Sequence, residues 1–438
     1  MATTLKIGVN QLKIGMYVAQ LDRPWLETPF LFQGFYIRDQ DEIRDLQTYC
    51  DYVYILRENG SEMPAPEKHG GTADGSMTWR AAPQRKRWFR LPFFRWRGSR
   101  AKEKNDPEVQ YTQPGMYYEE TESVEKELKA ATAIHDDAVV TVQEVMNNLR
   151  VSDKLDVQRL ESAVTPMVNS ILRNPAALSC LVRLQKKDDY LYHHSLASLI
   201  WATILGRHIG LNHRDLNVVA LGALLLDVGK IRLPDALLHK PGKLNEEETE
   251  IMRRHVDFGI EILDETEDLD NRIREMVQYH HERYNGTGYP QGLRGSQVPV
   301  FGRIAGIVDA YDAMITPRPY AEPMSSYEAF RQLRALADVE FQAELIDQFT
   351  QAIGVFPTGT LIELNTGEVG VVTRQNRVRR LRPEIMVIMD REKQIMDTFS
   401  VLDLNKEKID ERGRQSVWIE RGLAPGSFGI DPTEFFLD

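Results

Sequence analysis

The stretch of the chain with the clearest chemical character spans residues 280–290 and reads HHERYNGTGYP. It begins with two adjacent histidines, His280 and His281, and continues into a turn rich in glycine and proline. Neutral imidazole is a good ligand for first-row transition metals, and glycine lets the backbone come close to a bound ligand. The stretch therefore predicts a metal site.

Other residues of ligand type lie on either side of this stretch. Asp227 follows the apolar run of residues 218–226, and Asp309 lies in the apolar sequence IVDAYDA. A carboxylate in such a setting is costly to bury unless it is paired or bound to a metal. Eight of the ten histidines lie between residues 193 and 281, although any one of them alone could equally be a surface or core residue. Taken together, six residues predict a metal site: His194, Asp227, His255, His280, His281 and Asp309.

The elements that would position these residues have helical periodicity. Apolar residues recur at three-to-four spacing throughout residues 176–352, which predicts a mainly α protein with an all-helical bundle around the site. The expected helices span residues 178–186, 195–209, 215–228, 246–263, 271–281, 302–315, 326–336 and 343–353. Residues 119–175 predict a helical connector, for which core packing and a dimer-forming role are both open.

Both ends of the chain have strand character. Residues 1–57 predict a small N-terminal α+β domain, with strands in 9–21, 32–37 and 52–55 and a helix over 41–49. Residues 353–438 predict a small C-terminal β appendage with a tail, whose strands lie at 360–364, 369–373 and 385–389. The Asn-Thr-Gly sequence at 365–367 is typical of a hairpin turn. The polar tail from residue 405 is expected to dock only loosely.

The formal net charge of −11 hides a strongly basic segment at residues 79–104, within a linker predicted for residues 58–118. This segment carries ten Lys or Arg and one Glu, so its own charge is +9 and that of the remaining chain is −20. Its arginines alternate with Trp and Phe, which suits an anionic membrane surface or nucleic acid. The simpler interpretation is an arm that covers an acidic face, since Pro83 and Pro92 interrupt a long amphipathic helix. The acidic bulk of the chain argues against nucleic acid.

The compartment is predicted from what the sequence lacks. Cys50 and Cys180 are far apart and are interpreted as reduced thiols. The N-terminus has no cationic region followed by a long apolar run, and no stretch approaches the roughly 18 uncharged apolar residues of a membrane span. A cytoplasmic location is therefore expected.

The ordered motifs resemble the bacterial HD-GYP family, a branch of the HD phosphohydrolases that hydrolyses cyclic di-GMP. The resemblance covers residues 176–352 and rests on YHHS (192–195), DVGK (227–230), KPGKL (240–244), His255, residues 280–290, VDAYDA (308–313) and RPY (318–320). Residues 5–57 are similar to the domain of unknown function that often precedes HD-GYP domains. Residues 353–404 are similar to the family's usual C-terminal companion.

This resemblance implies a signalling enzyme that uses one or two divalent ions, iron or manganese, to convert cyclic di-GMP to pGpG or GMP. One metal would be held by His194, Asp227 and Asp309 and the other by His255, His280 and His281, with Asp227 bridging both. Two metals at such a site clamp the attacking and leaving oxygens and neutralise developing charge.

The resemblance also implies roles around the metals. Asp227 and Lys230 are the expected catalytic residues. Lys230 and Arg318 would hold the anionic phosphodiester, and Gly288, Tyr289 and Pro290 would shape the substrate loop. Besides cyclic di-GMP, the expected partners are diguanylate cyclases or other signalling proteins, a second copy of the chain and, through residues 79–104, a membrane surface.

Three positions depart from the family's pattern. The His-Asp pair reads Leu226-Asp227, and leucine has no lone pair to offer. His193 cannot replace the missing imidazole, since it points about 100° away from His194 on the same helix. Asn285 stands where aspartate is usual, and Ala321 where a basic residue is common.

These departures predict one well-occupied metal position, one weak or empty position, and weakened catalysis. Losing only an outer partner of a ligand costs roughly 10–100-fold in affinity or activity, and losing the ligand should cost more. Two functions therefore stay open. Family resemblance favours a weakened phosphodiesterase, and Leu226 favours a catalytically inactive module that binds cyclic di-GMP or protein partners.

Overall fold

The computed structural model describes residues 3–13, 16–22, 35–37, 40–58, 61–62, 118–184, 190–240, 242–266, 268–317, 322–376, 380–406, 416–430 and 435. It divides the chain into two compact units, Met1–Gly115 and Met116–Asp438. The basic segment 79–104 lies outside the described residues, as does the predicted linker around it apart from Glu58, Ser61, Glu62 and Tyr118.

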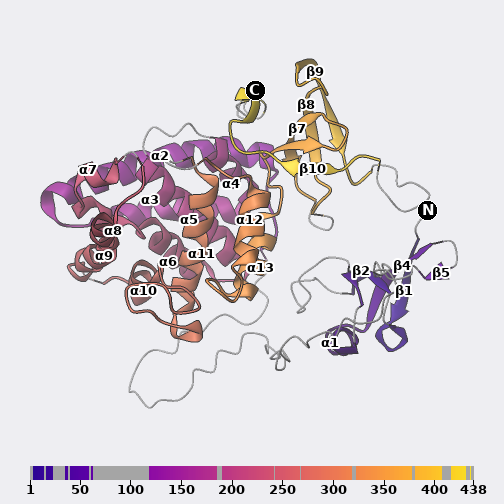
Figure 1. Ribbon diagram of the computed structural model, residues 1–438, viewed down its shortest axis with the longest axis horizontal. Helices are drawn as coiled ribbons and strands as arrows, with labels where there is room; N and C mark the ends of the chain where they lie inside the picture. Colours follow the sequence, from indigo (N-terminus) through magenta and orange to yellow (C-terminus); the bar gives the residue numbers. More distant parts are fainter. Residues whose placement is uncertain are drawn as a thin grey trace, which may run out of the picture. The chain divides into compact units, whose positions relative to one another are not determined.

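The first unit is an antiparallel sheet with one helix packed on it (Figure 1). Its elements are β1 (Thr3–Gly8), η1 (Val9–Gln11), β2 (Tyr17–Leu21), β3 (Phe35–Tyr36), α1 (Gln40–Tyr49), β4 (Tyr52–Glu58) and β5 (Ser61–Glu62). The strand order is β1-β4-β2-β3, and β5 pairs with β4. The α+β prediction is confirmed, but the strand expected over 9–21 is wrong in its first half. Val9 and Leu12 are buried in the core from a 3-10 turn, so their apolar character indicates burial and not a strand.

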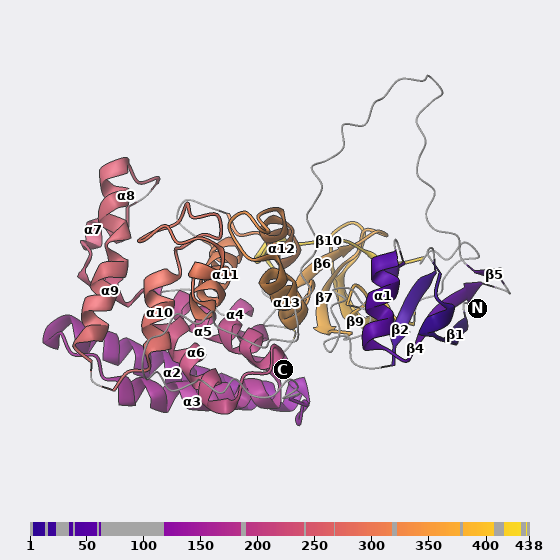
Figure 2. The same cartoon turned by 90° about the horizontal axis from the view of Figure 1, so that it is seen from below.

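The second unit is mainly α, which confirms the predicted fold class (Figures 1 and 2). Its helices are α2 (Val124–Ser152), α3 (Val157–Arg173), α4 (Pro175–Leu184), α5 (Tyr190–His208), α6 (His213–Leu224), α7 (Asp235–Leu238), α8 (Glu246–Arg253), α9 (His255–Asp264), α10 (Asn271–Tyr279), α11 (Val300–Ile315), α12 (Ser326–Ala335) and α13 (Ala343–Ile353). Each helix described here is too short or too polar to span a bilayer.

Helices α2 and α3 pack side by side and belong to the bundle. The buried carboxylate of Glu127, near the start of α2, accepts hydrogen bonds from Nε and Nη2 of Arg173, at the end of α3, each at 2.7 Å. Ser170 Oγ donates to the same carboxylate at 2.7 Å. The apolar faces of both helices lie in one hydrophobic core with α4 to α6. This arrangement supports the core-packing interpretation of residues 119–175.

Two predicted helices are broken where they approach the site. The helix expected over 215–228 ends as α6 at Leu224, and a 3-10 helix, η3 (Val228–Arg232), follows it. The helix expected over 246–263 is two helices, α8 and α9, which follow one another in one column in Figure 2 with a break at Arg254. Apolar residues continue across both breaks, so periodicity alone does not reveal them. The breaks place Asp227 and His255 at element boundaries.

Close packing of η3 on α9 depends on Gly229. A Cβ at this position would overlap the carbonyl oxygen of His255 and the backbone nitrogen of Gly259. We expect Gly229→Ala to lower the free energy of unfolding by roughly 3 kcal/mol, because backbone atoms on both sides cannot move apart easily. Urea denaturation measures the change. Gly206→Ala is the control, since its Cβ would meet side-chain methyl groups of Leu216, Leu211 and Val219 and no backbone atom among its nearest neighbours. An equal loss in both variants would contradict the prediction.

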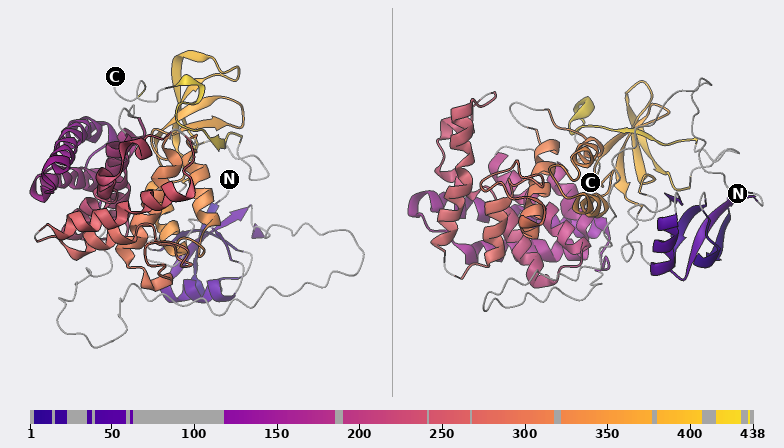
Figure 3. Two further views of the ribbon diagram at one scale, coloured as in Figure 1. Left: turned by 60° about the vertical axis from the view of Figure 1, so that its left-hand side comes forward. Right: turned by 60° about the horizontal axis from the view of Figure 1, so that its bottom comes forward.

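The C-terminal part is a five-stranded antiparallel sheet in the order β10-β6-β7-β8-β9. Figure 3 draws this sheet as arrows in orange to yellow. Its strands are β6 (Leu361–Leu364), β7 (Val369–Arg374), β8 (Glu384–Met389), β9 (Ile395–Asp403) and β10 (Ile419–Gly422). The three predicted strands are confirmed. The part of the tail at residues 416–430 does not dock loosely, because β10 pairs with β6 and the backbone N–H of Leu423 donates to the carbonyl of Leu361 at 2.9 Å.

Candidate metal centre

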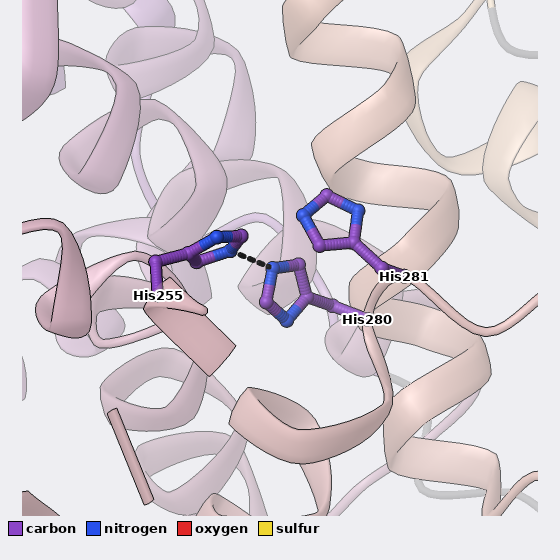
Figure 4. A group of neighbouring side chains, drawn as sticks. All are labelled: His255, His280 and His281. Atoms are coloured by element: carbon purple, nitrogen blue, oxygen red, sulfur yellow. Dashed lines mark hydrogen bonds between the residues drawn. The ribbon is translucent and has the colours of Figure 1, made fainter. Parts of the chain in front are cut away.

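Three histidines from two elements converge at the centre of the site. His255 begins α9, and His280 and His281 directly follow α10 (Figure 4). One ligand nitrogen from each of the three rings lies within 4.8 Å of the others. His255 and His280 are fully buried, and His281 is partly buried.

Backbone carbonyls determine how two of these rings present their nitrogens. His255 Nδ1 lies 2.7 Å from the carbonyl oxygen of Met252, and His280 Nδ1 lies 2.8 Å from that of Val277. A carbonyl oxygen only accepts, so each Nδ1 carries the proton and each Nε2 offers a lone pair. The two Nε2 atoms are 3.3 Å apart, the approach that is dashed in Figure 4. Two facing lone pairs repel, whereas a shared cation satisfies both, so this donor set fits a metal ion.

A proton shared by the two Nε2 atoms would also relieve their repulsion, but burial disfavours the charged ring that this would create. Burial lowers the pKa of His255 to about 4, although the charge of Asp227 opposes the shift. Burial also lowers the pKa of His280, and it lowers that of His281 well below the usual range. The rings are therefore neutral near pH 7, which is the form that binds metals.

Asp227 lies between the three histidines and the other predicted ligands. Its Oδ1 is 3.4 Å from His255 Nε2, and its Oδ2 is 3.6 Å from His194 Nε2 and 2.6 Å from Lys230 Nζ. Burial would raise the pKa of this carboxyl, but Lys230, followed by His255 and His194, holds the pKa well below its usual range. Asp227 is thus a buried carboxylate with oxygens directed to both sides of the site.

The remaining two predicted ligands meet on the far side of Asp227. His194, on α5, has its Nε2 3.1 Å from Asp309 Oδ1 and its Nδ1 2.7 Å from Asp312 Oδ2. Burial would lower the pKa of His194, but hydrogen bonds to Asp309 and Asp312 raise it to about 9. The same hydrogen bond from His194 overcomes the effect of burial on Asp309 and keeps its pKa well below the usual range. The structure thereby brings all six predicted ligand residues together.

The two sides of the site differ in donors. One side has three imidazoles, and the other has a single imidazole with two carboxylates. Leu226, which precedes Asp227, is 2% exposed and packs in the main hydrophobic core. It contributes packing where the family pattern has an imidazole nitrogen.

Lys230, which is predicted to hold the phosphodiester, contacts a predicted metal ligand. Its Nζ is paired with Asp227, and the side chain is 21% exposed. Arg318 and Ala321 lie outside the described residues.

The Gly-Tyr-Pro segment lies beside His281. The Tyr289 ring stacks on the His281 ring with centroids 4.6 Å apart, and the Arg253 guanidinium carbon is 5.0 Å from the Tyr289 ring centroid. A Cβ on Gly288 would overlap backbone atoms of residues 281–283, which explains the glycine. Asn285 Oδ1 accepts hydrogen bonds from the Thr287 backbone N–H at 3.0 Å and hydroxyl at 2.7 Å. Asparagine can therefore replace the usual aspartate in this turn, because both hydrogen bonds to Thr287 need only an acceptor oxygen at position 285.

Three residues around the site were not assigned roles from the sequence. The buried carboxylate of Glu282 accepts from the backbone N–H groups of Gln291 at 2.7 Å and Leu293 at 2.9 Å, which holds the loop that follows Pro290. Asp312 and Trp201 form a network behind His194. The sequence does mark Asp312, because it is a second acidic residue three positions after Asp309 on an apolar helix. It does not mark Trp201.

Comparison with protein-family models finds matches along most of the chain. A model of the HD domain matches residues 177–345, and a model of a KOW domain associated with the HD domain matches residues 361–409. A model of a domain of unknown function, DUF3391, matches residues 4–160.

The chain is also similar to curated proteins. It is 28% identical over 409 residues to a cyclic di-GMP phosphodiesterase of Pseudomonas aeruginosa, covering 93% of this chain and 90% of that protein. It is 34% identical to the cyclic di-GMP phosphodiesterase response regulator of Xanthomonas campestris, over 36% of this chain and 44% of that protein. It is 37% identical to the 3′3′-cGAMP-specific phosphodiesterase 2 of Vibrio cholerae, over 32% of this chain and 27% of that protein. The chain spans less than half of the length of the last two relatives.

Proposed function

The chain is an HD-domain protein of the HD-GYP type, and from this premise we propose that it is a metal-dependent phosphodiesterase that hydrolyses cyclic di-GMP to pGpG or GMP. The observation that carries the proposal is the convergence of two donor groups on either side of Asp227. The names of the relatives support the substrate. Leu226 reduces the donors on one side, so we propose weakened turnover.

The metal is a divalent ion, and we propose iron or manganese. Imidazoles suit iron and carboxylates suit manganese, and this site offers both kinds of donor. When bound, the ion supplies Lewis-acid activation of the phosphodiester. We assign one ion to His255, His280 and His281 and a weaker second position to His194, Asp227 and Asp309.

The side chains of the protein supply orientation and charge around that ion. Lys230 holds Asp227 Oδ2, so that Oδ1 faces His255. Tyr289 covers one face of His281, and Arg253, close to the Tyr289 ring, provides positive charge for the anionic phosphodiester. Arg253 shares this proposed role with Lys230, and each is paired with a carboxylate, Lys230 with Asp227 and Arg253 with Glu250.

The test is turnover of cyclic di-GMP by protein purified without oxygen, with metal per chain measured on the same samples. We expect hydrolysis with Mn²⁺ or Fe²⁺, no hydrolysis after chelation, and recovery on adding the ion back. 3′3′-cGAMP is run in parallel, since one relative carries that name. Faster turnover of 3′3′-cGAMP would contradict the substrate assignment. Binding of cyclic di-GMP without turnover in either metal would leave the inactive binding module as the function.

A further inference from the structure

The buried carboxylate of Asp312 connects a tryptophan to a candidate metal ligand. Asp312 lies on α11 and is 1% exposed. Its Oδ1 accepts a hydrogen bond from Trp201 Nε1 at 3.1 Å, and its Oδ2 lies 2.7 Å from His194 Nδ1. The hydroxyl of Thr316 also donates to Oδ2, at 3.3 Å. The two oxygens of one carboxylate are therefore directed to two different partners.

We propose that Asp312, itself oriented by Trp201, is a positioning residue that holds an imidazole proton of His194 on Nδ1, so that Nε2, which faces Asp309, is the nitrogen that a metal can take. The inference deepens the proposed function and rests on it for the identity of the site. The inference concerns the side of the site next to Leu226. Of the three ligands assigned to that side, His194 supplies the imidazole and the other two are carboxylates. A carboxylate behind a metal-binding histidine sets the ring's tautomer and raises its basicity.

The three anchored histidines of the site differ in how they are held. Backbone carbonyls anchor His255 and His280, and no substitution can remove those oxygens. A side-chain carboxylate anchors His194. The His194 side can therefore be altered by one substitution while the carbonyl-anchored rings keep their tautomer.

An amide at position 312 should reverse the tautomer of His194. The indole N–H of Trp201 can only donate, so in Asp312→Asn the amide oxygen must face Trp201. The amide nitrogen then faces His194 Nδ1, and because it can only donate, Nδ1 must accept. The imidazole proton moves to Nε2, where it donates to Asp309 and blocks metal binding.

The same reasoning predicts that a second substitution repairs the first. Trp201→Phe keeps an aromatic ring beside Tyr311 but removes the N–H that orients the residue-312 side chain. In the double variant residue 201 no longer holds the amide oxygen, so the oxygen can turn toward His194 and the proton can return to Nδ1. A purely structural role for these residues predicts the opposite, because each substitution would add its own loss.

The experiment uses the full-length chain labelled with ¹⁵N-histidine. The tautomer of His194 is read from long-range ¹H–¹⁵N correlations of the metal-free protein, recorded over a pH series until the ring is neutral. Mn²⁺ affinity is measured separately by calorimetry. We expect the Nδ1–H form in the natural protein, the Nε2–H form and roughly 10–100-fold weaker Mn²⁺ binding at the His194 side in Asp312→Asn, and recovery of both in the double variant.

Asp347→Asn is the matched control. Asp347 is a buried carboxylate on α13 that pairs with Arg334, so its loss should lower stability and leave Mn²⁺ affinity unchanged. Retention of Nδ1–H in Asp312→Asn, or failure of Trp201→Phe to restore it, would overturn the proposal. The tautomer is read without substrate or metal. It therefore decides this inference even if the chain does not hydrolyse cyclic di-GMP.

Discussion

Replacing Asp227 with asparagine should abolish tight metal binding and reduce turnover of cyclic di-GMP on the order of 10³-fold. Asp227 is the carboxylate whose oxygens lie 3.4 Å from His255 Nε2 and 3.6 Å from His194 Nε2, so its charge acts on both sides of the site. An amide removes that charge and presents an N–H₂ group to one side. Metal per chain and turnover in excess Mn²⁺ are the two measurements.

The control for this variant is Asp264→Asn. Asp264 is an exposed carboxylate at the end of α9 that pairs with Arg274, and its loss should change neither measurement. Because Asp227→Asn also leaves Lys230 without its carboxylate, the fold of the variant is checked by circular dichroism. A folded Asp227→Asn variant that keeps its metal and its turnover would remove Asp227 from the site.

The ligand set could be predicted because its members are conspicuous in sequence. Asp227 and Asp309 interrupt apolar runs, and His280 and His281 stand before a glycine-rich turn, so residue type alone marks them. Their meeting in space depends on helix boundaries that carry no such mark. The apolar run continues without a break from residue 218 to 226, although α6 ends at Leu224 within it and the chain turns at Asp227.

Partners of polar residues were harder to predict than the residues themselves. Lys230 is predicted to hold a phosphate, and its three-residue spacing from Asp227 also lets it pair with that carboxylate at 2.6 Å, a contact that was not predicted. The anchor of His194 comes from an aspartate 118 residues away, and such a distance has no sequence signal. β9 was missed because its residues are largely exposed and it therefore lacks a buried stripe.

Replacing Leu226 with histidine should increase turnover of cyclic di-GMP by roughly 10–100-fold and raise Mn²⁺ content from about one to about two per chain. The substitution restores the His-Asp pair of the family pattern beside Asp227. The side of the site with one imidazole and two carboxylates would then gain a second neutral nitrogen donor. The His255 side has its three imidazoles already and should bind Mn²⁺ as before.

The same substitution should destabilise the metal-free protein. Leu226 is 2% exposed in the main core, and a buried imidazole without a partner costs about 1–3 kcal/mol. A metal that binds only the folded state stabilises the protein, and the stabilisation grows with the affinity of the metal. We therefore expect a lower Tm than the natural protein without metal, and a larger rise in Tm when Mn²⁺ is added.

Leu226→Met separates the effect of the donor from the effect of disturbing the core. Methionine has a volume close to that of leucine, and its soft thioether is a poor ligand for Mn²⁺. If both variants bind the same amount of Mn²⁺, the side chain at position 226 does not reach the metal. If the natural protein already holds two ions and turns over as fast as Leu226→His, another group completes the site, and Leu226 is then not the cause of weakened catalysis.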